Sequence, residues 1–184
     1  MDKKGLLRKK FFIKRKIRYF KIDQNFFSPL KKLIDKKFKK KKLNFSLYFP
    51  SSYEVDILKI LDVDYFRKSN FLLPIIEKGN VMNFYRWKKM DILYVNKYGL
   101  LEPIKSKRII PDVVMVPLLA FDKYKNRLGY GKGFYDKFLN RYLSINKKII
   151  TVGVAFSFQR HHKLPISKND IKLDFILTEK GLVN

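Results

Sequence analysis

The chain has no cysteine among its 184 residues. Disulfides, thiolate-bound zinc, iron–sulfur clusters and a cysteine nucleophile are therefore excluded, and nothing in the composition favours secretion. Long apolar runs are also missing. The most apolar window, IIPDVVMVPLLAF at 109–121, contains an aspartate and two prolines and is too short to span a bilayer. No apolar core of a signal peptide precedes Phe27. We expect a cytoplasmic protein with no membrane partner.

Acidic residues are scarce, because 16 Asp and Glu face 42 Lys and Arg, which gives a net charge of +26. Such a balance is typical of proteins that bind nucleic acid, anionic membranes or polyanionic substrates. Only nine of the cations are arginine, the residue that most often reads base edges. We therefore favour a compositional drift toward lysine and do not expect a nucleic-acid partner. The alternative is a nucleic-acid-binding protein, whose affinity would fall steeply with salt.

Apolar periodicity indicates an α/β protein. Helical spacing predicts helices over Lys3–Lys21, Ser28–Phe38, Val55–Phe66 and Gly133–Leu143. Apolar and β-branched runs predict strands over 45–49, 70–76, 81–87, 109–116, 149–156 and 173–179, with Pro74 ending the second of them. Buried strands that alternate with helices predict a three-layer α/β/α fold with a mainly parallel central sheet. No linker or repeat divides the chain, so we expect a single domain over residues 1–184.

One glycine-rich stretch follows a predicted buried strand and runs into a predicted helix: RLGYGKGFYDKFL at 127–139. The backbone of Gly129, Gly131 and Gly133 can approach a phosphate closely, and the helix N-terminus that follows attracts anions. Lys132 and Arg127 add positive charge. The spacing G-x-G-x-G is neither the dinucleotide fingerprint nor a Walker loop. Taken by itself, the stretch is therefore either a phosphate cradle or an ordinary strand-to-helix turn.

Asp136 lies in the first turn of the predicted helix that follows this loop. A carboxylate beside bound phosphates can hold Mg²⁺ through an oxygen ligand. The alternative is an acid that only stabilises the helix N-terminus.

The longer string DVVMVPLLAFDKYKNRLGYGKGFYDKFL at 112–139 resembles the signature of the 5-formyltetrahydrofolate cyclo-ligase family. Four other segments resemble the family in the same order, so the resemblance covers nearly the whole chain: KGLLRKK, LYFPSSYEVD, NKYGLLEP and FQRHHKLPISKNDIKLDFILTE. It implies an enzyme that uses ATP and Mg²⁺ to convert 5-formyltetrahydrofolate to 5,10-methenyltetrahydrofolate, with release of ADP and phosphate. The implied chemistry is phosphorylation of the formyl oxygen followed by ring closure.

The same resemblance implies roles for individual residues. The implied ATP-binding residues are Lys4, Arg8, Arg127, Leu128, Gly129, Tyr130, Gly131, Lys132, Gly133, Phe134 and Tyr135. The implied folate-binding residues are Phe49, Glu54, Met82, Trp87, Tyr130 and Phe134, and the implied metal ligands are Asp136 and Asp170. At position 134 the family more usually has tyrosine, so this chain lacks one hydroxyl there.

Ordinary structural roles stay open for several of these residues. Glu54 can be an acid at a helix N-terminus, Met82 and Trp87 can be core residues, and Asp170 can be a turn residue. A different ATP-using ligase or transferase with a changed pterin pocket also remains an alternative. We expect a monomer whose surplus lysines, including those at 39–42, favour folates that carry several glutamates.

Overall fold

The computed structural model describes residues 2–39, 42–145 and 148–183. Lys40 and Lys41 of the predicted basic run lie outside the described residues. A seven-stranded sheet has the order β11-β10-β9-β6-β1-β2-β3. Its strands are β1 (Asn44–Ser46), β2 (Asn70–Glu77), β3 (Val81–Arg86), β6 (Val113–Pro117), β9 (Ile150–Val154), β10 (Phe175–Thr178) and β11 (Gly181–Val183). Neighbours from β10 to β2 pair in parallel, and the edge strands β3 and β11 pair antiparallel. The predicted mainly parallel sheet is confirmed.

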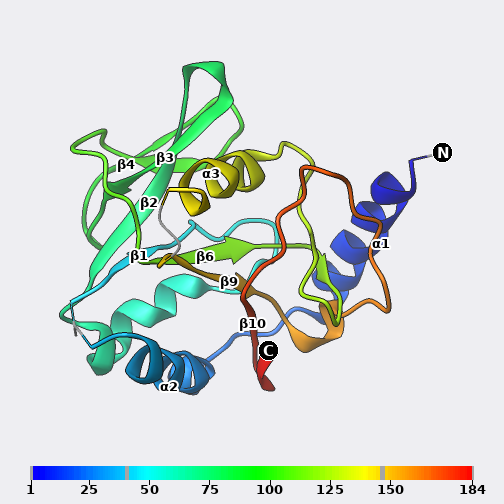
Figure 1. The fold of residues 1–184 in the computed structure, drawn as a ribbon, viewed down its shortest axis with the longest axis horizontal. Coiled ribbons are helices and arrows are strands. Elements are labelled where there is room, and N and C mark those ends of the chain that lie inside the picture. Colours follow the sequence, from blue (N-terminus) through cyan, green and yellow to red (C-terminus); the bar gives the residue numbers. More distant parts are fainter. Residues whose placement is uncertain (1, 40–41, 146–147, 184) are drawn as a thin grey trace.

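Helices and small hairpins surround this sheet (Figure 1). The α-helices are α1 (Lys3–Arg18), α2 (Ser28–Lys37) and α3 (Phe134–Leu143). The 3₁₀ segments are η1 (Gln24–Phe27), η2 (Ile57–Asp62), η3 (Asp64–Phe66), η4 (Lys78–Asn80) and η5 (Ser157–Gln159). Two antiparallel pairs join β4 (Leu93–Val95) to β5 (Leu101–Pro103), and β7 (Ala120–Phe121) to β8 (Arg127–Leu128).

Side-chain alternation along the central strands divides the core between the two faces of the sheet. From β6, Val113 and Met115 join a cluster with α2 and η2, whereas Val114 and Val116 join a cluster with α3. All four side chains are completely buried. Both faces of this parallel strand are covered, which explains why its sequence is apolar throughout and rich in valine. In Figure 1, α2 and α3 accordingly lie on opposite sides of the sheet.

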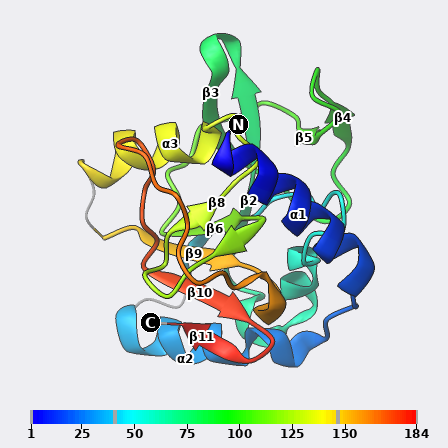
Figure 2. The same cartoon turned by 90° about the vertical axis from the view of Figure 1, so that its right-hand side faces the viewer.

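Helix α1 lies across the carboxyl ends of the parallel strands, toward which the arrow of β6 points (Figures 1 and 2). Phe11 anchors it there, since this side chain is 2% exposed and packs in a cluster with Leu119, Ala120 and Leu128. In open α/β sheets, ligands bind beyond this edge. The fold therefore brings α1 to the edge where a ligand site is expected.

Several predicted element bounds are wrong. The predicted helix Val55–Phe66 consists of the 3₁₀ segments η2 and η3, and the buried Ile57 and Ile60 are three residues apart, as a 3₁₀ turn requires. The predicted helix Lys3–Lys21 ends at Arg18. The strand predicted from Ile109 begins at Val113, after Pro111, whose ring removes a backbone donor.

Pro74 does not end its strand, contrary to the sequence prediction, because β2 continues to Glu77. The carbonyl of Phe71 accepts from Trp87 at the β3 side, and that of Leu72 accepts from Leu47 at the β1 side. Alternation therefore turns the backbone nitrogen of Pro74 away from β3. The missing N–H of Pro74 thus removes no hydrogen bond to β3.

Among the helices in the described ranges, none has the length and apolarity that crossing a membrane requires.

Candidate active site

A cavity of about 570 Å³ opens at the carboxyl edge of the sheet. Its wall combines α1, the loop after β1, strands β2 and β3, the β4–β5 hairpin and the glycine loop before α3. Every residue predicted for ATP, folate or metal binding lines this cavity except Trp87. Further lining residues are Tyr48, Ser51, Ser52, Pro74, Ile76, Tyr98, Leu100, Leu101, Glu102, Pro117 and Ser167.

The glycine loop has the backbone conformation that its sequence favours. Gly131 has a φ of 100° and Gly133 has a φ of 68°, both in the left-handed region that side chains disfavour. Gly133 is the residue directly before α3, so the loop delivers the chain to a helix N-terminus that faces the cavity. Such an N-terminus offers unpaired N–H groups and a positive dipole end to an anion.

Helix α1 adds two cations to this loop. The Nε of Arg8 donates to the carbonyl of Gly129 at 3.0 Å, and a Cβ on Gly131 would lie 3.2 Å from the guanidinium carbon of Arg8. One turn earlier, Lys4 forms an ion pair with Asp170 and donates to Ser167 at 3.0 Å. Lys4 and Arg8 are four residues apart, so they lie on one face of α1, and both line the cavity.

Arg127 and Asp136, which flank the glycine loop in the sequence, form an ion pair. The Nη2 of Arg127 lies 2.6 Å from Oδ1 of Asp136, and the Arg127 side chain is only 4% exposed. The backbone N–H of Ile171 donates to the same Oδ1 at 3.0 Å. Burial lowers the pKa of the Arg127 guanidinium, and the Asp136 charge opposes this shift. Asp136 thus ties the glycine loop to the segment that carries Asp170.

Asp170 is held ionised by its neighbours. Burial disfavours its charge, but hydrogen bonds from Lys4 and from the backbone and side chain of Ser167 together lower its pKa. Its Oδ2 accepts from Lys4 and from the Ser167 N–H, the latter at 2.7 Å. Within the described ranges, no group of three or more His, Cys, Asp or Glu residues gathers into a cluster that could hold a metal ion. Two carboxylates near Arg127 suit Mg²⁺ only when phosphates complete its oxygen shell.

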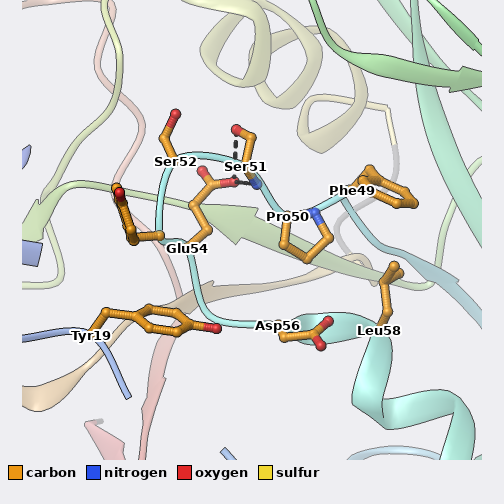
Figure 3. Close-up of a pocket in the computed structure, with 9 residues that line it drawn as sticks. Tyr19, Phe49, Pro50, Ser51, Ser52, Glu54, Asp56 and Leu58 are labelled. Carbon is orange, nitrogen blue, oxygen red and sulfur yellow. Dashed lines mark hydrogen bonds between the residues drawn. The ribbon is translucent and has the colours of Figure 1, made fainter. Parts of the chain in front are cut away.

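Glu54 follows an unusual turn after β1. Ser52 and Tyr53 have positive φ values of 48° and 64°, which costs non-glycine residues conformational energy and is common near functional sites. The turn buries Glu54 to 7% exposure, and its Oε2 accepts from the Ser51 N–H at 2.9 Å (Figure 3). The Tyr130 hydroxyl donates to Oε1 at 2.5 Å.

Burial raises the pKa of Glu54, while the hydrogen bonds from Tyr130 and Ser51 and the charge of Arg15 counteract part of the shift. A carboxylate that is buried yet supplied with donors can accept further hydrogen bonds from a ligand. A second hollow of about 460 Å³ borders the other side of this turn, where Tyr19, Asp56 and Leu58 join Phe49 and Glu54 (Figure 3).

Aromatic and apolar side chains form another part of the cavity wall. The rings of Tyr98 and Phe134 lie 5.5 Å apart, and the ammonium of Lys132 lies 5.8 Å from the centre of the Tyr98 ring. Met82, 4% exposed, extends the wall from β3. Tyr98 was not predicted, although it belongs to the segment NKYGLLEP that carried part of the family resemblance.

Trp87 does not line the cavity. It is 3% exposed and packs in the core cluster on the α2 side of the sheet. Five positions separate it from Met82, and an odd separation in a strand places two side chains on opposite faces. The structure therefore supports the alternative role of Trp87 as a core residue.

Arg15 does not itself line the cavity but contacts Tyr130, which does, and the sequence prediction missed it. It is 1% exposed, and its Nη2 donates to the Tyr130 hydroxyl at 2.6 Å. Helix α1 contains nine lysines and arginines, so the charge of Arg15 did not distinguish it from the others. Its position could have done so, because residues 4, 8, 11 and 15 lie on one face of a helix.

Fold and cavity together define an α/β protein with a candidate ligand site beyond the carboxyl ends of its parallel strands. This site combines a glycine loop, clustered cations and a buried carboxylate. The chain belongs to the 5-formyltetrahydrofolate cyclo-ligase family, whose model matches residues 1–179.

Curated relatives agree with this family membership. The chain is similar to the 5-formyltetrahydrofolate cyclo-ligase of Haemophilus influenzae, with 32% identity over 141 residues that cover 73% of this chain and 74% of the relative. It is similar to a probable 5-formyltetrahydrofolate cyclo-ligase of Schizosaccharomyces pombe, with 30% identity over 145 residues and 71% of each chain covered.

Solved structures share the fold. The NMR structure of Aquifex aeolicus 5,10-methenyltetrahydrofolate synthetase matches with a TM-score of 0.73 and 31% identity, over 97% of this chain and 91% of that one. A 5,10-methenyltetrahydrofolate synthetase from Mycoplasma pneumoniae matches in fold with a TM-score of 0.70 at 24% identity, over 96% and 98% of the two chains. The α/β fold predicted from the sequence is confirmed.

Proposed function

We propose that the cavity at the carboxyl edge is the active site in which this 5-formyltetrahydrofolate cyclo-ligase converts 5-formyltetrahydrofolate to 5,10-methenyltetrahydrofolate with ATP. The observation that carries the proposal is the convergence of the glycine loop, the α1 cations and Glu54 on one cavity, in a chain of this family. ADP and inorganic phosphate are the other products.

The chemistry requires activation of a formamide. Its carbon is a poor electrophile and its oxygen a poor leaving group. In the proposed first step, the formyl oxygen attacks the γ-phosphorus of ATP and the bond to the ADP oxygen breaks. The neighbouring amine nitrogen then attacks the formyl carbon and loses its proton, and the carbon–oxygen bond breaks to release phosphate. The protein mainly has to align two ligands and stabilise moving phosphoryl charge.

The glycine loop and α1 suit the phosphate end of this reaction. Arg8 and Lys132 lie at or within the loop, and the α3 N-terminus follows it directly. These groups supply point charges, a guanidinium fork and backbone N–H donors, which are the groups that bind phosphate oxygens. We propose that they hold the triphosphate of ATP.

Glu54 suits the pterin end. A pterin edge presents amino and ring N–H donors, and a carboxylate oriented by Ser51 and Tyr130 can accept from them. Met82 and Phe134 supply the apolar surfaces that a ring system packs against.

Asp136 and Asp170 are the proposed magnesium-binding residues. Each engages its protein partners through one oxygen, Oδ1 in Asp136 and Oδ2 in Asp170. When bound with ATP, Mg²⁺ would neutralise phosphate charge. We further propose, from the sequence, that the protein is a single-domain monomer located in the cytoplasm. We also propose that it accepts folates with several glutamates and does not bind nucleic acid.

An absorbance assay for the methenyl product tests the proposal. Purified protein is expected to form the methenyl chromophore only when 5-formyltetrahydrofolate, ATP and a divalent metal are all present. Product formation without ATP would contradict the proposed phosphoryl transfer, and no product with any divalent metal would contradict the assignment.

A further inference from the structure

Arg15 is a buried cation in a helix whose other lysines and arginines are exposed or half-buried. It is 1% exposed and is among the largest fully buried side chains of the described residues. Its Nη2 donates to the carbonyl of Ser52 at 2.7 Å, and its Nη1 lies 3.4 Å from the carbonyl of Leu118. Its Nε has no hydrogen-bond partner within the part of the chain that the structure describes. Burying a charge costs free energy unless hydrogen bonds or an opposite charge compensate for the lost water, so the position of Arg15 calls for an explanation.

The guanidinium reaches Glu54 through one intervening hydroxyl. The Tyr130 hydroxyl accepts from Arg15 at 2.6 Å and donates to Oε1 of Glu54 at 2.5 Å. The guanidinium carbon lies 5.5 Å from the centre of the Tyr130 ring. A hydroxyl that accepts from a cation becomes a better donor, because hydrogen bonds in a chain polarise one another. The positive charge therefore acts on the carboxylate without touching it.

Arg15 also holds the turn that carries Glu54. Its bond to the Ser52 carbonyl lies two residues before the carboxylate, in the stretch where Ser52 and Tyr53 have positive φ values. A strained turn persists when neighbouring groups fix it. Through one side chain, α1 thus grips both the Glu54 turn and Tyr130 of the glycine loop.

We propose that Arg15 is a positioning residue of the cyclo-ligase reaction, which acts through Tyr130 and the Ser52 carbonyl to keep Glu54 oriented and ionised for the pterin. This inference rests on the proposed function of the cavity. It assigns to α1 a role in folate recognition in addition to its phosphate-facing Lys4 and Arg8.

The groups that face Glu54 set the sign of the expected pH effect. Burial raises the pKa of Glu54, and Tyr130, Ser51 and the charge of Arg15 lower it. Tyr48 and Tyr135 also face it, and burial raises the pKa of both, which keeps them neutral. Without the Arg15 charge, the pKa of Glu54 rises further. Protonation then removes the acceptor at a higher pH, so the acid limb of folate binding moves upward.

The test compares Arg15→Gln, which removes the charge, with Arg15→Lys, which keeps it. The control is Lys16→Gln, the same change of charge at an exposed position of the same helix. We measure kcat/KM for 5-formyltetrahydrofolate against pH, and folate binding by calorimetry over the same range. Arg15→Gln should move the acid limb up by about one pH unit and raise the KM for folate about tenfold, more than that for ATP. Arg15→Lys should retain the acid limb, and Lys16→Gln should match the wild type.

Tyr130→Phe completes a double-mutant cycle with Arg15→Gln. Because Tyr130→Phe removes only a hydroxyl, it also tests the proposal if Arg15→Gln fails to fold. It should itself move the acid limb upward, and adding Arg15→Gln should then cause little further shift. An acid limb that stays in place in Arg15→Gln and Tyr130→Phe, with activity lost equally at all pH values, would show that Arg15 is only structural. Equal shifts from Arg15→Gln with and without the hydroxyl would overturn the route through Tyr130.

Calorimetry of folate binding distinguishes a failure of the proposed function from a failure of the role proposed for Arg15. A wild type that binds folate but forms no product would contradict the proposed function, while its binding profile would still decide the role of Arg15. A wild type that does not bind folate would overturn both.

Discussion

Replacing Gly131 with alanine adds one methyl group where the structure gives it two separate costs. The φ of Gly131 is 100°, a region that side chains rarely adopt. The new Cβ would also lie 3.2 Å from the guanidinium carbon of Arg8, and 3.4 Å from its Nε. That Nε donates to the carbonyl of Gly129 at 3.0 Å, so displacing Arg8 weakens this hydrogen bond.

The two costs can be estimated separately. Backbone strain at positive φ costs about 1–3 kcal/mol, and a weakened hydrogen bond costs about 0.5–1.5 kcal/mol. Alanine also lowers the conformational entropy of the unfolded chain, which stabilises the folded protein by about 0.4–1 kcal/mol. We expect Gly131→Ala to lower the free energy of unfolding by about 2 kcal/mol, and the Tm by about 4–8 °C for a chain of this size. ATP affinity should fall about 10- to 100-fold, since charge-assisted bonds to phosphate are disturbed.

Two neighbouring glycines supply matched controls. Gly133 has a φ of 68°, and no atom lies within 4 Å of a Cβ added there. Gly133→Ala therefore measures backbone strain alone, and the free energy of unfolding should fall by about 1 kcal/mol. Gly129 has no positive φ and no atom within 4 Å, so Gly129→Ala should leave the Tm unchanged or slightly raised. Melting curves and calorimetry of ATP binding on all three variants separate strain, contact with Arg8 and ligand binding.

A Gly131→Ala protein that melts normally and binds ATP normally would refute this reasoning. The loop would then be only a turn, and the nucleotide would lie elsewhere. A protein that melts lower but binds ATP normally would keep the strain argument and reject the phosphate cradle.

Three further predictions follow from the charged groups. Glu54→Gln should weaken folate binding while ATP affinity stays nearly unchanged, and an equal loss for both ligands in calorimetry would mean that Glu54 is structural. Asp136→Asn leaves the Arg127 guanidinium without its ion-pair partner, so unfolding free energy should fall by about 2 kcal/mol, and the lost activity should recover in part at high Mg²⁺. An unchanged Mg²⁺ dependence of activity would argue against Asp136 as a metal ligand. Folates with several glutamates should bind better than monoglutamates at low salt, with the difference shrinking as salt rises. Equal affinities at low ionic strength would make the surplus lysines irrelevant to substrate.

Much of the fold could be predicted from the sequence because its strongest patterns are local. The valine-rich run at 113–116 favours a buried strand, and the glycine loop leads directly into an amphipathic helix. Short elements carried no comparable signal. The β4–β5 hairpin has three residues in each strand, mostly exposed or half-buried, so its stability depends on the neighbouring β2.

The glycine loop could be located from the sequence, because closely spaced glycines indicate a tight turn or a close approach of the backbone to a ligand. Arg15 was missed because its role depends on burial, which a lysine-rich helix conceals, and on Tyr130 and Ser52, which only the tertiary structure brings to it. Trp87, predicted to bind folate, lies in the core and not in the cavity wall, as strand alternation relative to Met82 already indicated.

Transfer of an oxygen isotope tests the central claim most directly. 5-Formyltetrahydrofolate labelled with ¹⁸O in its formyl group is incubated with the enzyme, ATP and Mg²⁺, and the phosphate is analysed by mass spectrometry. If the formyl oxygen is phosphorylated and leaves as phosphate, the label should appear in inorganic phosphate, one atom for each methenyl product formed. Product formation with unlabelled phosphate would contradict the account, because the formyl oxygen would then have left by a route that does not pass through ATP.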